Sequence, residues 1–144
     1  RGTPDWEAVW PGQAQLEAML AEGRAEEAAR AFMADWGAGV PWEAMPAAQR
    51  ARFAEQMDLV QAVTAANFAD PGNILREDGL EGIDAPVLII RGETSPAIIA
   101  PVCEAIAARL PDVGLAVVPG AGHMLPLTHA SQTAELIALN LERQ

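Results

Sequence analysis

Apolar residues recur at helical spacing through most of the first half of the chain. The pattern covers Gln13–Glu22, Ala25–Trp36 and Pro46–Phe68, and glycine or proline lies close after each stretch. We expect one helix for each stretch. The apolar positions predict the buried faces of the second and third helices, which carry Ala28, Ala29, Phe32, Met33 and Trp36, and Phe53, Met57, Val60, Val63 and Thr64 respectively.

The second half has a different pattern, in which short apolar runs alternate with helical spacing. Ala85–Ile90 is rich in β-branched residues and does not alternate with polar ones, which predicts a strand buried on both faces. A helix is predicted over Pro96–Leu110, a second strand over Gly114–Val118, and a final helix over roughly Ala130–Glu142. This order predicts an α/β fold built on a parallel βαβ unit.

A pair of parallel strands needs cover on both faces and on both edges, which the predicted helices cannot supply alone. We therefore expect the sheet to be completed from outside this chain, by a second polypeptide or by an N-terminal segment that precedes Arg1. The alternative interpretation is a helical protein that carries a small β-hairpin.

Charge and hydropathy exclude several kinds of partner. The 144 residues carry a formal net charge of −11, so nucleic acid is not an expected partner. Apolar stretches such as Ala85–Ile90 are far too short to span a membrane, and no secretory signal opens the sequence. With 51% hydrophobic residues, the composition fits a packed cytoplasmic protein of one ordinary domain.

The residue types that the chain lacks exclude several chemistries. There is no lysine, so neither a P-loop nor a pyridoxal phosphate Schiff base can form within the chain. Cys103 is the only cysteine, which excludes an internal disulfide and a thiolate cluster. His123 and His129 are the only histidines, and no carboxylates accompany them at a zinc-binding spacing. We expect no metal and no cofactor.

His123 is the strongest candidate for chemistry. It follows the predicted second strand through the turn Pro119-Gly120-Ala121-Gly122, and reacting groups in α/β proteins collect at the carboxyl ends of strands. A histidine there can accept and return a proton near neutral pH. The alternative is a loop histidine that only hydrogen-bonds a backbone carbonyl.

Three segments resemble the α/β-hydrolase family. Ile83–Glu93 is similar to its penultimate core strand, Pro111–His123 to its last strand and histidine loop, and Ala21–Phe32 to helices of its cap. The resemblance implies a helical cap over residues 1–79. It also implies the C-terminal β-α-β-α part of the hydrolase core over residues 80–144.

The family resemblance implies a serine nucleophile on a G-x-S-x-G turn, and this motif is absent. Ser95 and Ser131 are the only serines, and neither has glycines at that spacing. The nucleophile is therefore expected outside this chain. His123 would accept its proton during attack on a small-molecule ester, lactone or related carbonyl compound, and would then protonate the leaving group. A non-catalytic binding protein that retains His123 is the alternative.

The acid that orients the histidine is not at its commonest family position. That position falls on Ser95, which has no charge. Asp84 and Asp112 precede their strands, so they lie at the wrong end of the sheet to meet His123. Glu93 follows its strand, but a residue directly after a glycine there can point away from the histidine. We expect the acid in the part outside this chain, with Glu93 as the second choice.

The apolar residues of the predicted cap allow more than one interpretation. An acyl pocket and packing explain its four tryptophans, Trp6, Trp10, Trp36 and Trp42, equally well. Cys103 lies among apolar residues of a predicted helix, as a core thiol does.

Overall fold

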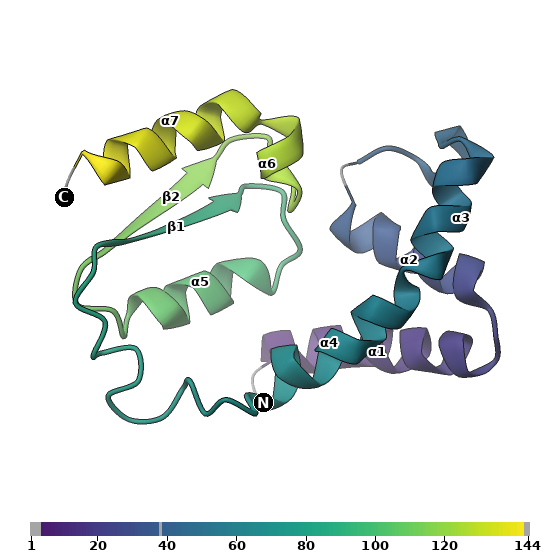
Figure 1. Ribbon diagram of the computed structural model, residues 1–144, viewed down its shortest axis with the longest axis horizontal. Coiled ribbons are helices and arrows are strands. Elements are labelled where there is room, and N and C mark those ends of the chain that lie inside the picture. Colours follow the sequence, from purple (N-terminus) through teal and green to yellow (C-terminus); the bar gives the residue numbers. More distant parts are fainter. Residues whose placement is uncertain (1–3, 38, 143–144) are drawn as a thin grey trace. The chain divides into compact units, whose positions relative to one another are not determined.

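A computed structural model of the chain describes residues 4–37 and 39–142. The chain forms two compact units, 1–72 and 73–144, coloured purple to blue-green and teal to yellow in Figure 1. The boundary between the units falls within Asp70–Asn73, the turn that follows the last helix of the first unit. The interpretation of residues 1–79 as a cap stays a prediction.

The first unit is helical, as predicted. Its elements are α1 (Pro4–Ala21), α2 (Ala25–Trp36), the short 3₁₀-helix η1 (Trp42–Ala44), α3 (Ala47–Glu55) and α4 (Met57–Ala69). The prediction for α2 is confirmed residue for residue. The helix predicted from Gln13 begins much earlier, at Pro4, because Pro11 and Gly12 do not interrupt it.

The single helix predicted over residues 46–68 is wrong, because the helix breaks at Gln56. The amide of Gln56 donates to the carbonyl oxygens of both Arg52 and Phe53, which tightens the last turn of α3. The α4 helix then starts at Met57 in a new direction (Figure 1). The apolar pattern continues across the break, so the pattern alone does not reveal it.

The core of the first unit gathers residues from four helices and the segment after η1. The buried set is Leu16, Ala28, Ala29, Trp42, Met45 and Met57. Phe32, Met33, Phe53 and Val60 pack against it, as their helical spacing predicted. Val63, by contrast, was expected on the buried side of its helix and is 49% exposed.

The second unit contains the predicted βαβ unit. Its elements are β1 (Val87–Gly92), α5 (Ile99–Ala107), β2 (Val113–Val118), α6 (Leu125–Thr128) and α7 (Ala130–Leu141). The strands pair in parallel, from Val87 beside Val113 to Gly92 beside Val118, which overturns the β-hairpin alternative. Figure 1 shows α7 along one side of the strand pair and α5 along the other.

Some boundaries and burial in the second unit differ from the sequence predictions. β1 begins after Pro86, which lacks the amide hydrogen that a ladder needs, and runs on to Gly92. The residues of β1 before Gly92 are half-buried rather than enclosed on both faces, since the sheet of the described chain has only two strands. The single-turn helix α6 is too short to leave a periodic pattern. Among the described residues, no helix has the length and hydropathy to span a membrane.

Arg109, which follows α5, holds the segment that opens the second unit. Its guanidinium donates to both Glu81 carboxylate oxygens, at 2.6 and 2.8 Å, and to the carbonyl oxygens of Leu75 (2.9 Å) and Arg76 (2.7 Å). The hydrogen bond from Arg109 holds the pKa of the Glu81 carboxyl at about 2. One side chain thus fixes a segment that has little regular structure.

Candidate active site

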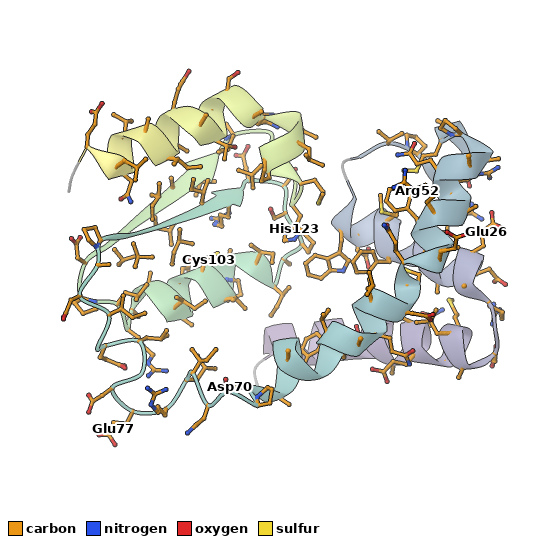
Figure 2. The ribbon with its side chains drawn as sticks, viewed as in Figure 1. Glu26, Arg52, Asp70, Glu77, Cys103 and His123 are labelled. Carbon is orange, nitrogen blue, oxygen red and sulfur yellow. The ribbon has the colours of Figure 1, made fainter. Side chains whose placement is uncertain are left out.

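The two strands end side by side, and His123 lies in the loop that follows β2. Gly92 and Val118, the last residues of β1 and β2, lie side by side in the strand pair. The loops that follow them therefore both leave from the carboxyl end of the strands. Figure 2 shows His123 beyond the carboxyl ends of the strands. The side chain is half-buried. His123 therefore lies at the carboxyl end of the strands, as the sequence predicted, whereas its role in catalysis stays a prediction.

The loop that carries His123 is anchored on each side by a buried residue. Ala121 is fully buried, and Leu125 is 6% exposed. Both pack with Val118 in one apolar cluster, against which Ile90 and Leu136 also pack. The backbone of the histidine loop is therefore held at points before and after His123.

Four hydrogen bonds tie this loop to the loop after β1, and we call them the loop strap. The amides of Glu93 and Thr94 donate to the carbonyl oxygens of Val118 (3.0 Å) and Ala121 (2.9 Å). Thr94 Oγ1 donates to the same Ala121 oxygen at 3.0 Å. The amide of Gly120 donates to Glu93 Oε2 at 2.8 Å. The Glu93 carboxylate, the second choice for the catalytic acid, thus binds the backbone of the histidine loop.

Two glycines allow this close approach. A Cβ atom at Gly92 would overlap the carbonyl oxygens of Ala121 and Gly122. Gly120 has a φ of +69°, in the left-handed region that other residues adopt at a cost. The glycine-rich turn can be recognised in the sequence, whereas the contacts of Gly92 and Thr94 cannot, because their only signal is a glycine at the end of a strand.

Ser95 occupies the position that the family pattern gives to the acid. Its Oγ atom is buried and has no hydrogen-bond partner among the described residues. The Ser95 amide donates to the carbonyl oxygen of Gly92 at 3.3 Å and turns the chain toward α5. Asp84 and Asp112 precede β1 and β2, so they lie at the amino-terminal end of the strands, away from His123, as predicted.

His129 and Cys103, the other histidine and the only cysteine of the chain, have surroundings that suit structural rather than catalytic residues. His129 is the residue before α7, and its Nδ1 lies 2.9 Å from Thr128 Oγ1. Cys103 is half-buried on α5 (Figure 2), and burial raises the pKa of its thiol, which disfavours the reactive thiolate. Within residues 4–37 and 39–142, no group of three His, Cys, Asp or Glu side chains could hold a metal ion.

The described tryptophans of the first unit take part in packing. Trp42 belongs to the buried core, and the Trp36 ring stacks on Phe32 with centroids 6.3 Å apart. The side chains of Trp6 and Trp10 lie outside the described residues. A surface hollow of about 450 Å³ in this unit is lined by Trp42 and by several charged residues, which include Arg24, Glu27, Arg30, Glu43 and Arg50.

Comparisons with known proteins cover most of the chain. A family model described as "Alpha/beta hydrolase family" matches residues 3–136. A solved structure described as an alpha/beta hydrolase from Sphaerobacter thermophilus DSM 20745 is 28% identical in sequence, with a TM-score of 0.42. That match covers 80% of this chain and 42% of the solved chain, so the matched part spans less than half of that hydrolase.

Proposed function

Because the chain belongs to the α/β-hydrolase family, we propose that it supplies the catalytic histidine and the cap of a hydrolase for small esters, lactones or related carbonyl compounds. Membership supports a hydrolase-type function. The observation that carries the proposal is the place of His123, on a loop anchored by buried Ala121 and Leu125 beyond the carboxyl end of β2. Four helices and η1 in residues 1–72 support a helical cap, proposed over residues 1–79.

In the proposed reaction, His123 moves the proton. A serine hydroxyl from the part of the core outside this chain attacks the carbonyl carbon while the imidazole accepts the serine proton. The imidazolium then protonates the leaving group, and the imidazole activates the water that releases the acid product. Backbone amides of the remaining core stabilise the oxyanion.

The remaining core would come from a second polypeptide or from a segment preceding Arg1. Exposed apolar side chains in the second unit support this, because they need cover; they include Leu115 and Val117 on β2, and Ile137 and Leu141 on α7. We place the acid that orients His123 in this remaining part, since Glu93 binds Gly120 and Ser95 is uncharged. The net charge of −11 supports a cytoplasmic enzyme without nucleic acid or membrane partners.

A fluorophosphonate probe tests the nucleophile and the histidine together. We expect the native protein to become labelled on a serine outside residues 1–144, and His123→Ala to reduce the labelling rate by about 100-fold or more, as for loss of a general base. The chain supplies a matched control, since His129→Ala removes its other histidine and should leave the rate within about twofold. An unlabelled native protein, or equal loss in both variants, would contradict the proposal.

A non-catalytic binding protein remains the second candidate because of Ser95. The usual acid position holds a buried hydroxyl with no described partner, as expected if the site had lost the acid that orients the imidazole. The same labelling experiment separates the two functions. A binding protein would leave the probe unreacted while a small carbonyl compound still shifted the imidazole resonance of His123.

A further inference from the structure

The loop between β2 and His123 is held less by its own side chains than by the loop after β1. Gly120 and Gly122 carry no side chain, and the conformational freedom of glycine makes such a turn costly to order. Only Ala121 between them is buried. The loop strap supplies the missing constraint.

We propose that Glu93 and Thr94 are positioning residues that fix the His123 loop, an inference that rests on the proposed hydrolase function. Their backbone amides would bind Val118 and Ala121 whatever side chains stood at these positions. The other two bonds of the strap depend on the side chains themselves, which are the carboxylate of Glu93 and the hydroxyl of Thr94.

The Glu93 carboxylate binds the loop where its backbone turns. Gly120 has a positive φ, and its amide donates to Glu93 Oε2 at 2.8 Å. A hydrogen bond from a backbone amide to a carboxylate is about twice as strong as a neutral one. Because Glu93 is exposed, water would replace it in a variant without the carboxylate, and the turn would lose its fixed partner.

The Thr94 hydroxyl acts one residue further along. Ala121 accepts both the amide and the hydroxyl of Thr94 on a single carbonyl oxygen, at 2.9 and 3.0 Å. Only Gly122 separates this fixed point from His123. A shift of about 1 Å in a reacting group lowers turnover by about 100-fold. The two side chains are therefore placed to set the direction from which the imidazole meets the nucleophile.

The test uses the native protein and paired variants that keep or remove each hydrogen bond. Glu93→Gln keeps an acceptor oxygen for Gly120 without the charge, whereas Glu93→Ala removes both. Thr94→Ser keeps the hydroxyl, and Thr94→Val removes it at nearly the same volume. Each variant is assayed for kcat and KM with p-nitrophenyl butyrate, and the amide exchange of Gly120 is followed by NMR in the Glu93 pair.

We expect Glu93→Ala and Thr94→Val to lower kcat by about 10- to 100-fold with KM within about threefold, because misplacement affects the transition state. Glu93→Ala should also speed Gly120 exchange by about tenfold, as a local opening would. The conservative variants should stay within about threefold of the native kcat, as hydrogen-bond rescue requires.

Other outcomes would overturn the inference in distinguishable ways. If Glu93→Gln loses as much activity as Glu93→Ala, the carboxylate acts through its charge and not by positioning. If Gly120 exchange rises in Glu93→Ala while kcat is unchanged, the strap is structural only, and the proposed hydrolase function still stands. A native protein with neither fluorophosphonate labelling nor ester hydrolysis would end both proposals together.

Discussion

A Cβ atom at Gly92 would lie less than 3.0 Å from the carbonyl oxygen of Ala121, closer than side chains pack in proteins. β1 must therefore end in glycine for the histidine loop to cross its last residue. The same atom would also meet the carbonyl oxygen of Gly122, so the loop cannot relieve the overlap by moving one peptide group.

Gly92→Ala should consequently destabilise the protein by about 1–3 kcal/mol, as overpacking does, measured by urea unfolding. Gly12→Ala is the control of opposite sign. Gly12 lies inside α1 with open space around its Cβ position, so alanine should stabilise by about 0.5–1 kcal/mol. An unchanged unfolding midpoint for Gly92→Ala would show that the loops separate more readily than the structure implies.

The Arg109–Glu81 pair should make stability depend on pH below neutrality. Arg109 lowers the pKa of Glu81 from 4.5 to about 2, so the carboxylate stabilises the folded state fully above about pH 4.5. This contribution is lost as the pH falls through about 2. The difference in unfolding free energy between native protein and Glu81→Gln should shrink over that range, and added salt should reduce it.

Arg109→Gln provides the comparison for that titration. The arginine also donates to the carbonyl oxygens of Leu75 and Arg76, which do not titrate. Urea unfolding should therefore show a deficit for Arg109→Gln that persists below pH 2, where the deficit of Glu81→Gln has disappeared. Identical pH curves for the two variants would mean that these carbonyl contacts contribute nothing.

Hydrogen exchange along β1 tests whether further strands complete the sheet. The amides of Val87 and Glu93 donate toward β2, and since alternate strand residues point the same way, those of Leu88 and Ile90 point to the opposite edge. In a completed sheet, both amides should exchange as slowly as that of Ile89. Rapid exchange confined to Leu88 and Ile90 would mean that β1 is a true edge.

Removal of the Ser95 hydroxyl should cost little, because Ser95 Oγ is buried with no described partner. We expect Ser95→Ala to change the unfolding free energy by less than about 0.5 kcal/mol, and Thr94→Val, which loses a hydrogen bond, to cost about 0.5–1.5 kcal/mol. Both are measured by urea unfolding. A larger loss for Ser95→Ala would reveal a partner in the remaining core, such as the acid that orients His123.

The elements that could be predicted from the sequence are those whose signals are local. Ala25–Trp36 has a single apolar stripe between glycine residues, and its bounds are those of α2. The strand Gly114–Val118 and the final helix differ from β2 and α7 by one residue at an end. The break at Gln56 could not be predicted, because neither glycine nor proline marks it and the packing of Met57 decides where α4 runs.

In the candidate site, too, features set by local sequence could be predicted and contacts between separate loops could not. The place of His123 follows from a strand, a turn and the rule that reacting groups collect at strand ends. The loop strap depends on which residues two separate loops bring together, and sequence spacing carries no information about that. The sequence therefore presents Glu93 only as a candidate acid, whereas in the structure its carboxylate binds the amide of Gly120.

The anchoring of the histidine loop also bears on the order in which such a protein is assembled. Its buried contacts and the loop strap come from β1, β2, α6 and α7 and the turns between them, all within the second unit. In the proposed enzyme, the loop that carries His123 is therefore held by contacts within its own unit, separately from the part that would supply the nucleophile. The remaining core of the proposed enzyme would then have to match the geometry of this loop rather than set it.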